Sequence, residues 1–185
     1  MIDDLLEDAR DHMARSVDAT RGKFGSVRTG RASPALLDRI VVDYYGAQTP
    51  LKQLATINVP EPRMLTVQPF DPSSIKEIER AILESELGLT PSNDGKVVRL
   101  PIPQLTEERR KELVKIVRQI AEDGRIAIRN VRRDADKHLK DLKSKGEVGE
   151  DDERRAEDRV QKLTDEHTSK IDELLKRKEA EITEV

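Results

Sequence analysis

The sequence from residue 106 to residue 143, TEERRKELVKIVRQIAEDGRIAIRNVRRDADKHLKDLK, decides the fold of this chain. Apolar residues recur in it at steps of three and four, the spacing that places side chains on one face of a helix. They are Leu113, Ile116, Val117, Ile120, Ala127, Ile128, Val131, Ala135, Leu139 and Leu142. Only Gly124 interrupts the pattern, and Thr106 can cap the first turn. The stretch predicts one helix of about 38 residues, about 57 Å long.

Two further helices with the same kind of apolar spacing flank this stretch. The first covers residues 2 to about 28, and a loop at 144–149 leads into the last, which begins near Asp151. Their apolar positions are Ile2, Leu5, Leu6, Ala9, Met13, Val17, Phe24 and Val27 in the first, and Ala156, Val160, Leu163, Ile171, Leu174, Leu175 and Ile182 in the last. A helix with one narrow apolar stripe is not stable alone. The three therefore predict a long antiparallel three-helix bundle.

The segment between the first two helices has a different pattern. Its β-branched and aromatic residues form short runs separated by turn-forming residues, which is typical of strands. The runs lie at 40–45, 51–59, 64–67 and 96–100. We expect a small, mostly β, α/β domain at residues 31–104, inserted into a bundle domain at residues 1–30 and 105–185. The fold class is thus α+β.

A short helix and two irregular crossings complete the inserted domain. Ile75, Ile78 and Ile82 share one helical face, Ser74 and Glu77 can form a capping box, and Gly88 can end the helix. The crossings to the bundle are rich in glycine and proline, so bending is expected there. The predicted hinge residues are Gly30, Arg31, Ala32, Pro103 and Gln104.

The composition limits the possible classes of protein. Charged residues make up 38% of the chain and aromatic residues 2%, and there is no cysteine. Disulfides, thiolate metal sites and a cysteine nucleophile are therefore excluded. The acidic N-terminus does not fit a secretory signal, and no apolar run is long enough to span a bilayer. We expect a soluble, cytoplasmic protein with no membrane partner.

The charge is distributed unevenly along the chain. Its net value is −3, which taken alone argues against nucleic-acid binding. Residues 105–143, however, hold twelve Lys or Arg against eight Asp or Glu, a local net charge of +4, and residues 144–185 carry −5. The pI of the whole chain therefore hides a basic central helix.

The basic residues of the central helix form a stripe. On a helical wheel Lys111, Arg118, Arg125, Arg129, Arg132, Lys140 and Lys143 lie within about 80° of each other, and we expect them opposite the apolar seam. Arg110, Lys115 and Arg133 flank this stripe. Guanidinium groups bind phosphate oxygens in pairs and stack on bases, which suits structured RNA. A solvated helix face, or a surface for a protein partner, explains the same pattern.

No catalytic motif accompanies this stripe. The three histidines, His12, His138 and His167, have no zinc-ligand spacing, and the last two fall near the helix seams, where packing explains them. Phosphate-binding loops and nucleophile elbows are absent from the sequence. Of Tyr44 and Tyr45, one is expected to pack and the other to be exposed. The sequence predicts a protein that is not an enzyme and needs no cofactor or metal. The competing hypotheses are a coiled-coil protein-interaction adaptor and a hydrolase with an unrecognised carboxylate site.

Several runs are long enough to compare with a known family. They are RTGRASP (28–34), DYYG (43–46), TPL (49–51), QLA (53–55), LGL (87–89), PSNDG (91–95), LTEERRK (105–111) and RNVRRDA (129–135). In this order they resemble the ribosome recycling factor family over essentially the whole chain. Glu86 is a mild departure, since the family more often has an aspartate before its Leu-Gly-Leu.

The resemblance implies both a shape and a role. The shape is an L similar in outline to a transfer RNA. The role is to bind the post-termination 70S ribosome at large-subunit ribosomal RNA and, with elongation factor G and GTP, to split it into subunits. The small domain would meet elongation factor G, and the protein would be monomeric.

The resemblance also carries individual residues over to RNA binding. Arg132 and Arg129 match the family's most distinctive run, Arg110 comes next, and Arg28 and Arg31 lie at the hinge end of the bundle. Together with the stripe they make the expected RNA-binding set: Arg132, Arg129, Arg110, Arg133, Arg125, Arg118, Lys111, Arg28 and Arg31.

Overall fold

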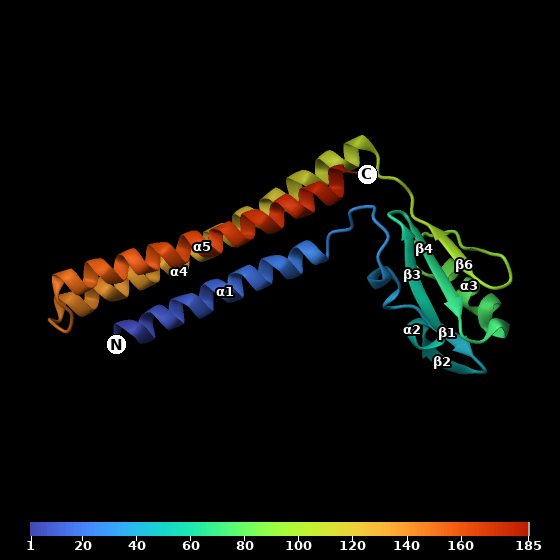
Figure 1. Cartoon of the computed structure of the whole chain (residues 1–185), viewed down its shortest axis with the longest axis horizontal. Coiled ribbons are helices and arrows are strands. Elements are labelled where there is room, and N and C mark those ends of the chain that lie inside the picture. Colours follow the sequence, from blue (N-terminus) through green and yellow to red (C-terminus); the bar gives the residue numbers. More distant parts are fainter. Residues whose placement is uncertain (185) are drawn as a thin grey trace. The chain divides into compact units, whose positions relative to one another are not determined.

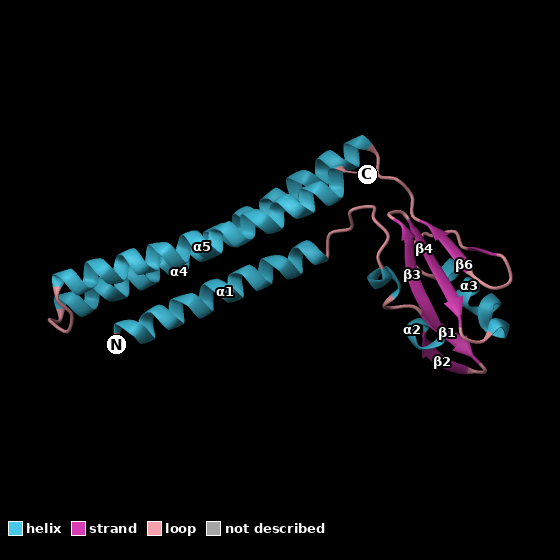
Figure 2. Ribbon diagram, in the orientation of Figure 1, coloured by secondary structure: helices cyan, strands magenta, loops and turns pink. Residues whose placement is uncertain are grey.

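The computed structural model of the chain describes residues 1–184. These residues divide into two compact units. The first consists of Met1–Arg28 and Glu107–Glu184, and the second is Thr29–Thr106. The regular structure of the first unit is all helix, whereas the second unit contains all the strands described (Figure 2). The predicted α+β class, a helical bundle with a small sheet domain inserted after its first helix, is confirmed.

Three long helices form the first unit: α1 (Ile2–Gly25), α4 (Glu107–Ser144) and α5 (Glu150–Thr183). Figure 1 shows α4 running opposite to α1 and α5. Each of the three helices contacts the other two, so the core lies along their common axis. Met13 of α1, Ile128 of α4 and Ile171 of α5 are fully buried in it. The regular spacing of such residues produces one continuous seam on each helix.

One glycine allows the three helices to pack closely. Gly124 of α4 is buried, and a Cβ at this position would overlap Oγ1 of Thr20 in α1 and lie 2.9 Å from Cδ1 of Ile171 in α5. The residue that interrupts the apolar pattern in the sequence is therefore part of the core. Thr20 is itself buried, and its hydroxyl donates to the Ser16 carbonyl at 2.8 Å.

The second unit contains two antiparallel sheets. A four-stranded sheet has the order β3-β4-β6-β5, formed by β3 (Ala55–Glu61), β4 (Met64–Pro69), β6 (Val98–Pro101) and β5 (Ser92–Asn93). A separate hairpin joins β1 (Val41–Tyr44) to β2 (Ala47–Pro50). The helix α3 (Ile75–Glu84) contacts β1. Its predicted face, Ile75, Ile78 and Ile82, is buried with Leu65, Val67 and Leu100 of the sheet.

Three local predictions for this unit are wrong. The helix α3 ends at Glu84, with Ser85 as its C-cap, and not at Gly88. Residues Leu51–Leu54 form one helical turn, α2, and not the start of a strand. The capping box is not formed either, because the Ser74 hydroxyl donates to the Asp71 carbonyl at 2.7 Å. Asp71 is the residue that caps, since its carboxylate accepts from the Ser73 amide at 3.0 Å and starts the short 3-10 helix Pro72–Ser74. Pro72 has no amide hydrogen and suits that first position.

The segments at both ends of the second unit are bonded to its β3–β4 turn. Ala32 donates to the Pro62 carbonyl at 2.7 Å, and Ile102 donates to the Arg63 carbonyl at 2.8 Å. Gly30 has a φ of +77°, and a Cβ there would lie 2.9 Å from Cγ of Leu105. The two connecting segments thus touch each other at Gly30 and Leu105. None of the described helices has the length and apolar character needed to cross a membrane.

Candidate nucleic-acid interface

The sequence predicted that the basic stripe of α4 lies opposite the apolar seam. In the structure the stripe lies beside α5. Arg125 precedes the buried Ile128 by three residues, and Arg132 follows it by four. On a helix these side chains are therefore only about 60° and about 40° from the core direction. Arg125, Arg129 and Arg132 are accordingly half-buried. The expectation that the stripe lies opposite the seam is therefore wrong for Arg125, Arg129 and Arg132, because α5 covers that edge. The other members of the stripe are exposed: Lys111, Arg118, Lys140 and Lys143.

Acidic residues of α5 meet this edge. Arg118 donates from Nε to Oε1 of Glu179 at 2.7 Å, and Arg125 donates from Nε to Oδ1 of Asp172 at 2.8 Å. Near the other end of α4, Lys143 lies 3.7 Å from Glu153. The net negative charge of the C-terminal segment is thus used in part to neutralise α4. These three cations hold the two helices together as well as facing solvent.

Glu122 joins two arginines within α4 itself. Its Oε1 accepts from Nη2 of Arg129 at 2.6 Å, and its Oε2 accepts from Nη1 of Arg125 at 3.2 Å. The bond from Arg129, followed by the one from Arg125, lowers the pKa of the Glu122 carboxyl. Glu122, Arg125, Arg129 and Asp172 form a connected network with a net charge of zero. The guanidinium groups in it are held in fixed positions.

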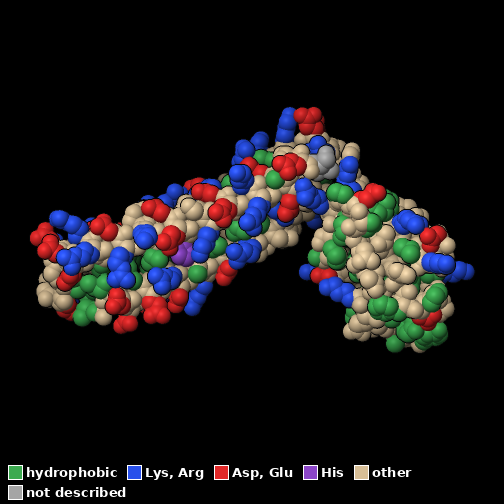
Figure 3. Space-filling view, viewed as in Figure 1, with side chains coloured by type: hydrophobic (Ala, Val, Ile, Leu, Met, Phe, Trp, Pro, Cys, Tyr) green, Lys and Arg blue, Asp and Glu red, His purple; other side chains and the backbone are tan. Residues whose placement is uncertain are grey.

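Arg132 and Arg133 differ from these paired arginines. Within residues 1–184 neither forms a side-chain hydrogen bond or ion pair. Arg132 is half-buried and Arg133 is exposed. Lys111, at the opposite end of the helix, is exposed and only 3.6 Å from Glu107. Figure 3 shows how closely Lys and Arg alternate with Asp and Glu along the bundle, so an arginine without a direct hydrogen bond or ion pair is a distinct feature.

A half-buried carboxylate lies in the same stripe. Asp136 is one turn from both Arg132 and Lys140, and its Oδ1 has no hydrogen-bond partner within the described part of the chain. Burial raises the pKa of the Asp136 carboxyl, and the charges of Arg132 and Lys140 only partly oppose this effect. The ionised form of Asp136 is therefore less favourable in the folded protein than in water.

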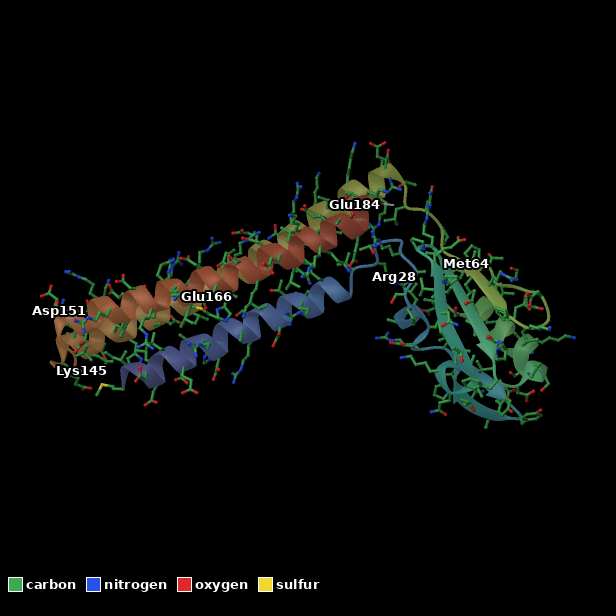
Figure 4. All side chains as sticks on the ribbon, in the orientation of Figure 1. Arg28, Met64, Lys145, Asp151, Glu166 and Glu184 are labelled. Atoms are coloured by element: carbon green, nitrogen blue, oxygen red, sulfur yellow. The ribbon has the colours of Figure 1, made fainter. Side chains whose placement is uncertain are left out.

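The remaining predicted residues lie in different places. Arg110 is half-buried, and its Nε is a buried donor without a partner among residues 1–184. Arg28 is exposed after the last turn of α1 (Figure 4) and belongs to the first unit. Arg31 is exposed in the second unit, with Gly30 and Ala32 on either side. Pro103 and Gln104 lie in the other connecting segment, just before Leu105.

The three histidines are not arranged as a metal site in residues 1–184. His167 is buried and its Nδ1 lies 2.7 Å from the Leu163 carbonyl, as expected for a packed histidine. His138 is exposed, contrary to expectation, and lines a recess of about 190 Å³ between α1 and α4 together with His12. No group of three or more His, Asp or Glu in residues 1–184 is placed to hold a metal ion.

Two features of the surface were missed from the sequence. Glu122 is the hub of the arginine network, yet in the sequence it is one acid among many, and only its spacing of three and seven residues from Arg125 and Arg129 signals the contact. Phe70 is 68% exposed. It follows a strand and precedes the capping Asp71, a position with no helical or strand periodicity to indicate its direction.

Comparison with known proteins gives a consistent result. Residues 20–183 match the sequence model described as "Ribosome recycling factor". A ribosome-recycling factor of Rubrobacter xylanophilus is 56% identical over 180 residues, covering 97% of each chain, and that of Carboxydothermus hydrogenoformans is 53% identical over the full length of both.

Solved structures agree with the sequence matches. The solution structure of a ribosome recycling factor superimposes with a TM-score of 0.74 at 41% identity, covering 100% of this chain and 98% of the other. A second structure has a TM-score of 0.65 at 49% identity and covers 98% of each chain. It is described as models for the T. thermophilus ribosome recycling factor and the E. coli elongation factor G bound to the E. coli post-termination complex.

Proposed function

Because the chain belongs to the ribosome recycling factor family, we propose that it binds the post-termination ribosome and, with elongation factor G and GTP, separates it into subunits. The support for these partners is the structural relative that is described in complex with elongation factor G and the post-termination ribosome. That relative is 49% identical and covers 98% of this chain.

The bundle is the part that docks on large-subunit ribosomal RNA. The single observation that carries this assignment is the half-buried Arg132, whose guanidinium forms no hydrogen bond or ion pair within residues 1–184, whereas Arg125 and Arg129 are both paired with acids. A guanidinium that is already partly removed from water loses less hydration when it meets a phosphate, and it can donate two parallel hydrogen bonds to it. Arg133 and Lys111 widen the contact, and Arg129 and Arg125 join it through Glu122.

The small unit and the connecting segments carry the second half of the function. In this proposal Thr29–Thr106 meets elongation factor G, while bending at Gly30, Arg31, Ala32, Pro103 and Gln104 lets it move relative to the docked bundle. The sequence contains no phosphate-binding loop, so GTP is hydrolysed by the elongation factor. The chain itself acts through binding energy and bulk between the subunits, without catalytic residues.

The experiment that tests this function uses Arg132→Ala and a matched control, Arg15→Ala, which removes an exposed arginine from α1. Loss of a charge-assisted phosphate contact should weaken binding to large subunits by about 1–3 kcal/mol, a factor of roughly 5 to 150. Subunit splitting with elongation factor G and GTP should fall in parallel. Arg15→Ala should behave as wild type, and circular dichroism should show both variants folded.

Two outcomes would contradict the proposal. Normal binding by a folded Arg132→Ala protein would remove the docking role of the stripe. Failure of the wild-type chain to split ribosomes in the presence of elongation factor G and GTP would remove the function itself. Salt-dependent binding to large subunits distinguishes RNA docking from an adaptor that binds an acidic protein, if naked duplex RNA does not compete.

A further inference from the structure

Three of the four aromatic residues of the chain belong to the second unit. They are Tyr44, Tyr45 and Phe70, and only Phe24 is elsewhere. The rings of Tyr44 and Tyr45 meet edge to face with centroids 4.6 Å apart. Tyr45 is 80% exposed and Phe70 is 68% exposed. Hydrophobic side chains are visible on the surface at the end of the unit where the β1–β2 hairpin turns (Figure 3). We call Tyr45, Phe70 and Asp71 the aromatic corner.

Tyr45 occupies a backbone conformation that suits other residues better. It forms the hairpin loop with Gly46, and the two have φ values of +50° and +83°. A two-residue loop of this kind favours Asn or Asp followed by Gly. A bulky residue in the left-handed region costs about 1–2 kcal/mol. The turn therefore does not explain the tyrosine, and its exposed ring adds little to the core.

Hydrogen bonds hold this corner in one arrangement. The hydroxyls of Tyr44 and Tyr45 donate to Oδ2 of Asp71 at 3.0 and 3.4 Å. The other carboxylate oxygen of Asp71 accepts from the amide and the hydroxyl of Ser73 at 3.0 and 2.7 Å. The bonds from Ser73, followed by that from Tyr44, lower the pKa of Asp71, so the corner carries a fixed negative charge. A surface arranged in advance loses less entropy on binding.

The surrounding charge selects the kind of partner. Asp43 lies beside the same turn, where its Oδ1 accepts from the Gly46 amide at 2.9 Å. The positive charge of Arg80 interacts with Asp43, but Nε of Arg80 is already paired with Oε1 of Glu84 at 3.0 Å. Exposed aromatic rings can stack on RNA bases, but a phosphate backbone would be repelled by Asp43 and Asp71. Exposed aromatic rings, which are enriched at protein interfaces, fit a protein partner instead, and the two acids require that this partner carry positive charge.

We propose that the aromatic corner is a protein-docking surface, and that its partner presents a lysine or arginine beside apolar side chains. The rings of Tyr45 and Phe70 supply the apolar contact, since buried aromatic residues dominate the energy of protein interfaces. Asp71 pairs with the cation. The inference rests on the proposed function in one respect: the partner is sought among the proteins of the post-termination complex.

A crosslinking experiment tests the class of partner. The chain has no cysteine, so Tyr45→Cys creates a single attachment site for a benzophenone label at the corner, and Val59→Cys, on exposed β3, provides the control. With purified ribosomes and elongation factor G, the label at residue 45 should form adducts with a protein segment that contains Lys or Arg. Adducts with ribosomal RNA, or no more protein adduct than from residue 59, would overturn the proposal.

A second measurement gives the size of the effect. Tyr45→Asn removes the ring and keeps a residue that tolerates the left-handed conformation, so folding should be preserved. Combined with Phe70→Ser it should lower the rate of subunit splitting at least tenfold, while binding of the bundle to large subunits stays within about twofold. Wild-type splitting in the same assay reports separately on the proposed function. A double variant that splits ribosomes as fast as wild type would show that the corner docks nothing.

Discussion

Arg129 donates from Nη2 to Oε1 of Glu122, 2.6 Å away and two helical turns earlier on α4. The same carboxylate also binds Arg125, which is bound in turn by Asp172 of α5. Burial disfavours the charged form of Arg125, but the bonds to Asp172 and Glu122 outweigh it and raise the pKa of the guanidinium. The arginines at the centre of the basic stripe are therefore positioned and partly neutralised by contacts within the protein itself.

Glu122→Gln should strengthen binding to large subunits. The glutamine can still accept one hydrogen bond from Arg129, so the geometry is kept while one negative charge is removed. The slope of log affinity against log salt should become steeper by about 0.7–0.9, the value for one additional phosphate contact. Filter binding at several salt concentrations measures both quantities. Weaker binding with an unchanged slope would mean that the charge of Glu122 positions Arg129 for RNA and does not compete with it.

Asp136→Asn should stabilise the bundle at neutral pH. Because burial raises the pKa of Asp136, its ionisation costs more in the folded than in the unfolded chain. Protonated Asp136 contributes its full stability to the folded state below its ordinary pKa of 3.8. That contribution to stability is lost as the pH rises through the higher pKa of the folded state. Asparagine never ionises, so its advantage should be largest near pH 7 and shrink toward pH 4.

Thermal unfolding of the two proteins between pH 4 and pH 7 measures this difference. Asp134→Asn removes the same charge from an exposed position on α4 and shows what charge alone contributes. If the advantage of Asp136→Asn stays constant over that range, burial does not control the ionisation of this residue.

The long helices could be predicted from the sequence because their apolar residues repeat over many turns. The seam residues Val117 and Leu139 were expected from that repeat, and α4 ends at Ser144, one residue after the predicted helix. Ile116, which the repeat also placed in the seam, is 42% exposed, so that part of the prediction is wrong. Short elements in the second unit were less predictable. Leu51 and Leu54 are both buried, and their spacing of three fits a helical turn, but β-branched neighbours suggested a strand. Asp71 and Ser74 are both residue types that cap helices well. Only Asp71 caps with its side chain, at the start of the 3-10 helix that begins with Pro72.

The candidate site was predictable as a set of residues but not as a set of contacts. The arginine stripe follows from the spacing along α4. Which of its members are paired depends on where α5 lies, and the spacing of α4 carries no information on Asp172 or Glu179. The aromatic corner depends even more on tertiary structure, because Tyr45 and Asp71 are 26 residues apart.

Gly124→Ala should destabilise the bundle. In an open helix, replacing glycine by alanine stabilises by about 0.5–1 kcal/mol. At this position the new methyl group would overlap Oγ1 of Thr20 and approach Ile171, and overpacking a core costs about 1–3 kcal/mol. The net change in the free energy of unfolding should therefore be a loss. Gly22→Ala on α1, where a Cβ meets nothing within 4 Å, should instead stabilise, and urea unfolding of both variants measures the contrast. Equal stabilisation by both would refute close packing at Gly124.

Gly30→Ala should destabilise the second unit through two separable effects. The φ of +77° costs a residue with a Cβ about 1–2 kcal/mol, and that Cβ would also lie 2.9 Å from Cγ of Leu105. Gly88→Ala in the same unit has a φ of +67° and open space, so it reports on the backbone effect alone. The difference between the two variants in thermal unfolding measures the contact with Leu105.

A double-variant cycle isolates that contact. Leu105→Ala shortens the side chain that meets the new methyl group, so the double variant Gly30→Ala, Leu105→Ala should be more stable than the sum of the single changes predicts. A coupling near zero would mean that the two connecting segments do not press on each other at this point. A coupling that favours the double variant, together with slower subunit splitting by Gly30→Ala, would tie the contact to the proposed hinge, because hinge residues must be free to change φ and ψ.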